Sequence, residues 1–337
     1  MPTYLKYLNH FIGKPNERNY RSAMKTVSLL IPVYNEEQTL KLLVDKINAL
    51  IISGLNGGGY KWEILFINDG SRDNSLQILE KLHKENPQIN YLNLSRNFGK
   101  ENAMLAGFDY INGDCCIIMD ADMQDPVELI PQMIHYWEEG FDDVYGKRRD
   151  RGKESWLRRK FSLAYYNILQ HTTSIEVLPN VGDFRLLDRR CIEALKQLRE
   201  TQRYTKGLFC WIGYKKKEIE FDRQDSMRDK SSFNFLKLFN LAIEGITSFT
   251  TAPLRFASVV GFIVSFCSFC YLVAVFVKTL LWGDPIQGFP ALMCVILMLG
   301  GIQLLAIGII GEYIGRIFNE TKNRPVYLVE SYNGKKI

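Results

Sequence analysis

The chain has 337 residues, a formal net charge of +5 and 47% hydrophobic residues. This length indicates more than one structural unit. The seven cysteines lie mostly in apolar runs and the four histidines are scattered, which argues against a disulfide framework and a zinc site. The modest charge, without aromatic stacking motifs or a DNA-reading fold, also argues against nucleic acid as a partner.

After an N-terminal extension, 1–25, short apolar runs alternate with segments of helical periodicity. We expect, in chain order, strand Val27–Val33, a helix from Glu36 to about Ile52, strand Glu63–Asn68, a helix over Ser75–Asn86, strand Asn90–Leu94, a helix ending near Ile111, and strand Cys115–Met119. Alternation of this kind predicts an α/β fold with a mainly parallel sheet and helices on both faces.

Polar clusters follow three of the expected strands. They are Tyr34-Asn35-Glu36, Asn68-Asp69-Gly70-Ser71 and Asp120-Ala121-Asp122. Each could be ordinary turn chemistry, but ligands of parallel sheets bind beyond the carboxyl ends of the strands, where all three would meet. Neither GxGxxG nor GxxxxGK[ST] is present at the positions that dinucleotide or P-loop binding requires.

The acidic pair Asp120 and Asp122 ends an apolar run and precedes Gln124-Asp125-Pro126. Carboxylate oxygens are the ligands that hard divalent cations prefer, and such a cation can hold a diphosphate. The pattern therefore predicts a cation site at the end of a strand. The alternative is a solvated acidic turn.

Two long apolar stretches, Phe256–Val277 and Pro285–Gly311, lie near the C-terminus. Each is long enough to cross a bilayer as a helix. Arg255 precedes the first stretch and several basic residues follow the second, which by the positive-inside rule places both ends in the cytoplasm. We therefore expect two transmembrane helices, with the polar part of the chain in the cytoplasm.

Two segments between the sheet and the spans have the pattern of interfacial amphipathic helices. Apolar residues recur at helical spacing over Leu157–Ile168, among Arg158, Arg159 and Lys160, and again over Phe233–Ile246. A basic amphipathic helix suits a surface of anionic lipid headgroups. Packing against the soluble domain is the alternative. The expected units are a catalytic domain, 26–222, a juxtamembrane segment, 223–254, the two spans, 255–318, and a cytoplasmic tail, 319–337.

These motifs, taken together, resemble family-2 glycosyltransferases of the GT-A (Rossmann-like) fold. The resemblance rests on Ile31–Glu37, Asn68–Ser71, Ser95–Glu101, Asp120–Pro126 and Gly182–Leu186, followed by two spans. Within this family the chain is most similar to the polyisoprenyl-phosphate glycosyltransferases, in particular bacterial bactoprenol glucosyltransferases. The resemblance covers about Val27–Glu330.

The resemblance implies a set of donor-binding and metal-binding residues. Asp120, Asp122 and Gln124 would surround Mg²⁺ or Mn²⁺. The residues implied to bind the nucleotide-sugar donor are Pro32, Tyr34, Glu36, Asp69, Asp120 and Lys100. Glu36 could instead be a first-turn helix acid favoured by the macrodipole. Lys100 and Arg96 could face the diphosphate or be surface charges.

The resemblance also implies the reaction. One sugar, with glucose from UDP-glucose as the best guess, would pass with inversion to undecaprenyl phosphate at the cytoplasmic face of the bacterial inner membrane. A lipid phosphate is already an anionic nucleophile, so positioning and charge neutralisation matter more than a strong base. The residues assigned to catalysis are Asp122, Asp125 and Asp183, the last two for a base or orienting role, and Arg148, which matches an arginine that cradles the acceptor phosphate.

Two other functions remain open at this point. A processive polysaccharide synthase shares the catalytic domain but normally adds a Gln-x-x-Arg-Trp motif and more spans, and Gln202-Arg203-Tyr204 does not satisfy that motif. A non-catalytic membrane scaffold that binds sugar nucleotides is the second. The GxxxG sequence Gly311–Gly315 is compatible with a homo-oligomer.

Overall fold

The computed structural model describes residues 24–51, 59–149, 181–201, 203–222 and 288–337, with isolated positions between 254 and 281. Most of the N-terminal extension, the two expected amphipathic helices and part of the first apolar stretch lie outside the described residues.

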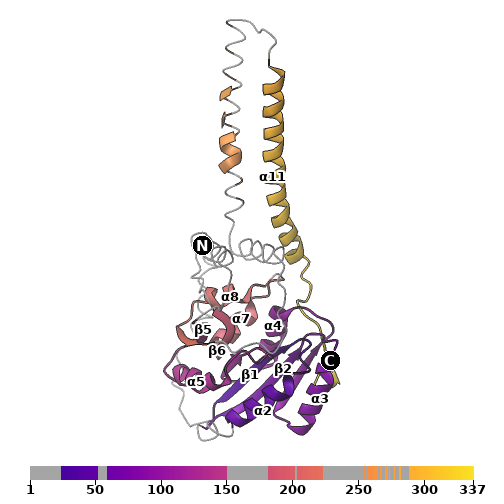
Figure 1. The fold of residues 1–337 in the computed structure, drawn as a ribbon, viewed down its shortest axis with the longest axis vertical. Coiled ribbons are helices and arrows are strands. Elements are labelled where there is room, and N and C mark those ends of the chain that lie inside the picture. The colour runs from indigo at the N-terminus through magenta and orange to yellow at the C-terminus, as the bar shows by residue number, and fades with distance from the viewer. Residues whose placement is uncertain are drawn as a thin grey trace, which may run out of the picture.

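The described part of the chain contains a nine-stranded sheet of order β7-β5-β6-β4-β1-β2-β3-β8-β9 (Figure 1). The four strands β4, β1, β2 and β3 are parallel, as the sequence predicts. β6, β8 and β9 pair antiparallel with their neighbours, so the whole sheet is mixed rather than mainly parallel. The strands are β1 Thr26–Val33, β2 Lys61–Asn68, β3 Ile89–Leu94, β4 Cys115–Ile118, β5 Asp143–Arg148, β6 Val181–Asp188, β7 Lys216–Phe221, β8 Val329–Tyr332 and β9 Lys335–Lys336.

Helices cover both faces of the sheet, as predicted. β1 is apolar on both sides: Leu29 and Ile31 belong to one core cluster and Leu30 to the other. Figure 1 shows α4, α7 and α8 on one side and α2, α3 and α5 on the opposite side. The bounds are α2 Leu40–Leu50, α3 Ser75–Glu85, α4 Lys100–Tyr110, η2 Val127–Leu129, α5 Ile130–Glu138, α7 Arg189–Gln197 and α8 Thr205–Trp211.

Two expected boundaries differ from the structure at the edge where the polar clusters lie. α2 begins at Leu40 and not at Glu36, because the backbone turns first, with the Thr39 and Leu40 N–H groups donating to the Glu36 carbonyl. β4 ends at Ile118, one residue before Met119. Both changes lengthen the loops at the carboxyl edge of the sheet.

The helix α11, Phe289–Thr321, projects away from the sheet (Figure 1). Its segment Met298–Thr321 is the one helix among the described residues that is long and apolar enough to cross a membrane. It begins later than the second expected span and continues past Gly311. The two-span prediction is thus met by one described helix; the described residues of the first stretch are helical, but positions outside the described residues interrupt them, so a second span is not confirmed.

Residues 329–336, which the sequence places in a cytoplasmic tail, extend the sheet instead. The chain returns from α11 and β8 pairs with β3, with Asn93 opposite Ser331. Asn333 and Gly334 join β8 to β9 with φ values of 50° and 78°, the conformation of a tight hairpin turn. The segment after the apolar helix is therefore part of the sheet.

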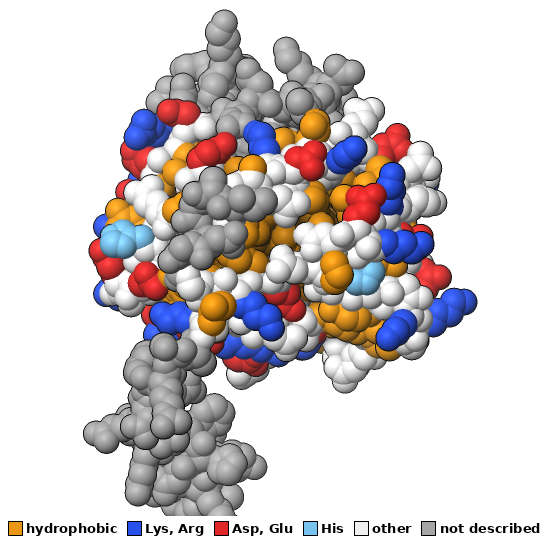
Figure 2. Space-filling view, turned by 90° about the horizontal axis from the view of Figure 1, so that it is seen from below, with side chains coloured by type: hydrophobic (Ala, Val, Ile, Leu, Met, Phe, Trp, Pro, Cys, Tyr) orange, Lys and Arg blue, Asp and Glu red, His pale blue; other side chains and the backbone are white. Residues whose placement is uncertain are grey.

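The face seen in Figure 2 carries Lys and Arg side chains interspersed with Asp and Glu around apolar side chains. Nucleic-acid binding needs basic side chains gathered into a patch or stripe. No such patch is visible among the described residues of this face.

Gly70, in the turn after β2, allows two loops to approach closely. Its φ is +63°, and a Cβ there would lie 2.5 Å from the Arg96 carbonyl carbon and from the Asn97 nitrogen. A contact that short with backbone can only be relieved by displacing the loop after β3. Glycine is therefore required for the packing of these loops as well as for the backbone conformation.

We expect Gly70→Ala to lower the free energy of unfolding by about 2 kcal/mol, because strain at positive φ and the backbone clash add together. Gly140→Ala is the matched control, since Gly140 has φ +88° but no atom within 4 Å of its Cβ position. Thermal unfolding of the purified variants measures the difference. Equal losses in the two variants would show that only the backbone conformation matters.

Candidate active site

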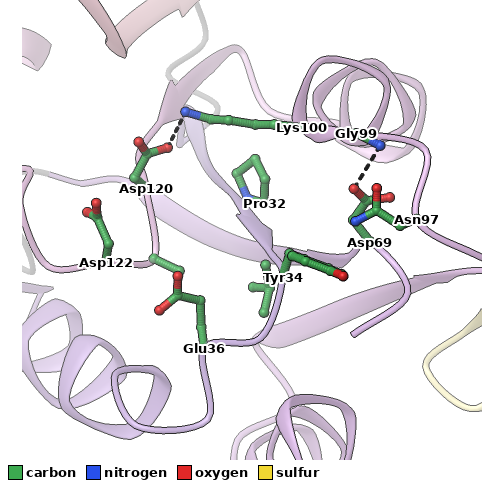
Figure 3. Close-up of a pocket in the computed structure, with 11 residues that line it drawn as sticks. Pro32, Tyr34, Glu36, Asp69, Asn97, Gly99, Lys100, Asp120 and Asp122 are labelled. Carbon is green, nitrogen blue, oxygen red and sulfur yellow. Dashed lines mark hydrogen bonds and ion pairs between the residues drawn. The ribbon is translucent and has the colours of Figure 1, made fainter. Parts of the chain in front are cut away.

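A cavity of about 290 Å³ opens at the carboxyl edge of the sheet, and we call it the edge cavity (Figure 3). Its walls come from the segments that follow β1, β2, β3 and β4. The lining residues are Pro32, Val33, Tyr34, Glu36, Asp69, Asn97, Gly99, Lys100, Asp120, Ala121 and Asp122. All six residues predicted to bind a donor therefore lie together, as does Asp122.

The segment after β3 also contributes Asn97 and Gly99. Both residues belong to the motif Ser95–Glu101, but they are not among the predicted site residues. Gly99 has φ +91° at the start of α4. A glycine between a strand end and a helix is the signal that could have marked this wall, because it lets the backbone approach a ligand.

The turn after β1 is held by the turn after β2. The Asn35 N–H donates to Ser71 Oγ at 3.0 Å, and the Glu36 N–H donates to Ser75 Oγ at 2.8 Å. Asn35 has φ 55°, and its side-chain oxygen accepts from the Arg72 N–H at 2.8 Å. These bonds fix Tyr34 and Glu36, the two cavity residues that flank Asn35.

Glu36 is 8% exposed, and its carboxylate accepts a hydrogen bond from Thr39 Oγ1 at 3.0 Å. α2 has no acidic residue in its first turn, so the interpretation of Glu36 as a first-turn helix acid is wrong. The side chain instead lies in the wall of the edge cavity.

Asp69 holds the segment that carries Lys100 (Figure 3). Its carboxylate accepts from the Phe98 N–H at 2.7 Å and from the Gly99 N–H at 2.9 Å. Burial raises the pKa of Asp69, while the two N–H groups act in the opposite direction. The observed contact of Asp69 is therefore with the protein backbone, at the rim of the cavity.

Lys100 bridges two aspartates that arrive from different strands. Its Nζ lies 2.6 Å from Asp120 Oδ1 and 2.5 Å from Asp183 Oδ2. Burial acts to lower the pKa of Lys100, but the charges of Asp183 and Asp120 outweigh it, and the pKa is raised. Lys100 is thus cationic at neutral pH, and its side chain, 38% exposed, lies in the wall of the edge cavity and pairs with two carboxylates. Arg96 stacks on the Phe98 ring at 4.1 Å and does not line the cavity.

Asp183 and Asp125 lie behind the cavity wall and contact its residues. Burial acts to raise the pKa of Asp183, but the charges of Lys100 and Lys206 outweigh it, so the pKa is lowered. Asp125 accepts from the Asp120 N–H at 2.8 Å, and burial together with the charge of Asp120 raises its pKa to about 7. Asp125 therefore orients Asp120, and ionised Asp183 is a poor proton acceptor.

Asp120 and Asp122 are two of the four carboxylates that line the cavity, the others being Glu36 and Asp69 (Figure 3). Asp122 Oδ1 accepts from the Gln124 N–H at 3.1 Å, and Met123 between them has φ 65°. Gln124 is buried and does not line the cavity.

The described residues contain no group of three or more His, Cys, Asp or Glu that could hold a metal. Two carboxylates are a partial set of hard oxygen ligands. They suit Mg²⁺ or Mn²⁺, which take their remaining ligands from substrate phosphates and water. The donor set therefore fits a cation that binds together with a diphosphate.

Arg148 ends β5, outside the edge cavity, and its guanidinium lies against Gly182 of β6. β6 itself is fixed by Arg185, which is 2% exposed and lies 3.0 Å from the fully buried Asp143. The Arg185 guanidinium also covers the Phe209 ring at 3.7 Å. This ion pair sets the position of β6 and thereby of Asp183.

Two family models match the chain: glycosyl transferase family 2 over residues 28–196, and the GtrB C-terminal hairpin over residues 252–317. An uncharacterized glycosyltransferase of Synechocystis sp. is 42% identical over 308 residues, 91% of this chain and 96% of that protein. The bactoprenol glucosyl transferase of Shigella phage SfX is 41% identical over 305 residues, 90% of this chain and 99% of that protein. The putative glycosyltransferase CsbB of Bacillus subtilis is 40% identical over 307 residues, 91% of this chain and 92% of that protein.

The first match contains every residue that lines the edge cavity. The sheet with helices on both faces agrees with the GT-A fold that the sequence motifs imply. The chain therefore belongs to glycosyl transferase family 2 and is a glycosyltransferase, similar over most of its length to bactoprenol glucosyl transferases.

Proposed function

We propose that the protein transfers one glucose from UDP-glucose to undecaprenyl phosphate, with inversion and with Mg²⁺ or Mn²⁺, at the cytoplasmic face of the bacterial inner membrane. The observation that carries this proposal is the edge cavity, where two carboxylates and a cationic lysine meet. The relatives named bactoprenol glucosyl transferase, which are 41% identical over 90% of this chain, support glucose as the sugar and the lipid phosphate as the acceptor.

The donor is proposed to occupy the edge cavity along its length. Pro32, Tyr34 and Glu36 form the wall on which the nucleoside would lie, and Asp69 holds the opposite rim. Asp120 and Asp122 would hold the cation, with Gln124 completing the turn. The diphosphate would then lie beside Lys100, whose ammonium group bridges Asp120 and Asp183.

Loss of the sugar leaves negative charge on the diphosphate, and a divalent cation supplies charge stabilisation there. The chain's own contribution is a fixed arrangement of charge that exists before substrate binds. Lys100 is held by two carboxylates, and Asp120 is held in turn by Asp125. Such preorganised groups lower the barrier because they need no rearrangement as charge develops.

The acceptor is proposed to approach from the membrane side. α11 is apolar enough to lie in a bilayer and continues into the catalytic domain through β8. A lipid phosphate needs no strong base, which agrees with the lowered pKa of Asp183. Direct attack on the anomeric carbon inverts its configuration. Arg148, on the strand beside Asp183, would neutralise the acceptor phosphate.

The membrane arrangement extends this proposal. Two spans with both termini in the cytoplasm, and two amphipathic helices on the membrane surface, would keep the edge cavity close to the lipid phosphate. Two spans offer no enclosed channel for a growing polymer, so transfer of a single sugar is favoured over processive synthesis. A homo-oligomer through Gly311–Gly315 is compatible with this arrangement.

Transfer of labelled glucose from UDP-glucose into undecaprenyl phosphate tests the activity. We expect one sugar per lipid, abolished by a chelator, because the diphosphate charge is then unneutralised. Asp122→Ala should lower kcat by about 100-fold or more, the loss typical of one preorganised electrostatic group. Asp45→Ala, at an exposed carboxylate of α2, is the control and should keep full activity. Long polymer, or transfer that a chelator does not affect, would contradict the proposal.

A second prediction concerns Lys100. Lys100→Met removes the cation between Asp120 and Asp183, and we expect kcat/KM for UDP-glucose to fall by about 100-fold. Lys100→Arg keeps the charge with a different donor geometry and should retain more activity than Lys100→Met. Lys81→Met removes an exposed lysine of α3 and serves as the control. Unchanged kinetics in Lys100→Met would show that the lysine has no role beside the diphosphate.

A further inference from the structure

A line of side-chain hydrogen bonds connects the strand after α11 to the edge cavity. We propose that Glu330, on β8, is a positioning residue for donor binding and acts through Asn93, Asn68 and Ser71. This inference rests on the proposed function, because it takes the edge cavity to be the donor site.

The line has four consecutive bonds. Asn93 Nδ2 donates to Glu330 Oε2 at 2.9 Å, and Asn68 Nδ2 donates to Asn93 Oδ1 at 2.7 Å. The Ser71 N–H donates to Asn68 Oδ1 at 3.3 Å, and the Asn35 N–H donates to Ser71 Oγ at 3.0 Å. Asn35 lies between the cavity residues Tyr34 and Glu36, so the line ends in the wall of the edge cavity.

The strand register places these side chains next to one another. Val33 of β1 pairs with Asn68 of β2, Asn68 with Asn93 of β3, and Asn93 with Ser331 of β8. The two asparagines are 1% and 6% exposed. Amides this deeply buried are costly to leave without partners, so each depends on the orientation of the next.

Glu330 sets that orientation, because an ionised carboxylate can only accept hydrogen bonds. Asn93 must therefore turn its amide nitrogen towards Glu330 and its oxygen towards Asn68. Asn68 in turn presents its nitrogen to Asn93 and keeps its oxygen for the Ser71 N–H. Glu330 at one end of the line and the Ser71 N–H, which can only donate, at the other therefore favour the same orientation of both buried amides, and Asn68 holds the turn after β2.

The position of β8 does not depend on Glu330. The Asn333 side chain accepts from the Tyr91 N–H at 2.9 Å and donates to Asn90 Oδ1 at 2.8 Å. The Ser95 N–H donates to the Leu328 carbonyl at 3.0 Å. These bonds tie β8 to β3 on both sides of Glu330. A substitution at this exposed position therefore changes the line of hydrogen bonds while the strand stays in place.

The chain from α11 to β8 therefore both forms the apolar helix and supplies the strand that carries Glu330. α11 ends at Thr321 and β8 begins at Val329, so the strand that completes the line follows directly on the apolar helix. Donor binding in the cytoplasmic domain consequently requires the chain beyond the membrane helix to be seated on β3.

The test is UDP binding, in the presence of Mn²⁺, to the purified full-length chain and three variants at position 330. Glu330→Gln still offers an oxygen to Asn93, so its Kd should stay within about twofold of the wild type. Glu330→Ala leaves the Asn93 amide nitrogen without this acceptor, so the line is held only from its Ser71 end, and binding should weaken by about threefold. Glu330→Lys offers only donors and opposes the orientation, so binding should weaken by about tenfold or more.

Hydrogen exchange without ligand gives a second readout. Exchange at the Ser71 and Asn35 amides should become faster in the Ala and Lys variants and stay unchanged in the Gln variant. Lys336→Ala, on the outermost strand, is the control and should alter neither measurement. The KM for the lipid acceptor should be the same in all variants, because the line ends on the donor side.

Three results would overturn the inference. Equal UDP affinity in the wild type and all three variants would show that the line does not reach the donor. Equal weakening in all three, with a lower melting temperature, would show that Glu330 only stabilises β8. Failure of the wild-type chain to bind UDP would overturn the proposed donor as well, which distinguishes that failure from the other two.

Discussion

The ion pairs of Lys100 are the interaction on which the site depends. Asp120 comes from the end of β4, Asp183 from β6 and Lys100 from the start of α4, so one ammonium group joins three elements. The two aspartates would repel each other without it, because both lie within 2.6 Å of the same ammonium group. Burial raises the pKa of Asp120, and the charge of Lys100 acts against that rise while it lowers the pKa of Asp183, so Lys100 holds the two carboxylates close together at this edge.

The surrounding structure holds these three groups in place. Asp69 fixes the backbone just before Lys100, and Gly70 lets that backbone approach the turn after β2. The buried pair of Arg185 and Asp143 fixes β6. Breaking one partner of a buried pair is costly, whereas two exposed charges contribute little. Gly70 and Arg185 of this chain thus act mainly by fixing loops and strands around Lys100.

The wall of the edge cavity could be predicted from the sequence because it lies in short loops next to apolar strands, where local pattern and turn chemistry carry the signal. The pairings of β6 with β4, and of β8 with β3, could not. Glu330 and Asn93 are hydrogen-bonded although they are 237 residues apart in the sequence. Antiparallel pairing between such distant segments produces no local periodicity in the sequence from which it could be predicted. The dipeptide Asn333-Gly334 is typical of a hairpin turn and is the local sequence signal that could have predicted β8 and β9. Lys100 could be placed on the correct loop, but its two partners depend on tertiary packing.

Manganese binding to the purified full-length chain, followed by electron paramagnetic resonance with and without UDP, tests the central claim most directly. The two carboxylates proposed to hold the cation are Asp120 and Asp122, and Asp120 is already paired with Lys100, so the account predicts weak Mn²⁺ binding alone and tight binding when UDP is present. Asp120→Asn should abolish the tight binding. Equally tight Mn²⁺ binding without UDP, or UDP affinity that does not change with Mn²⁺, would contradict the account.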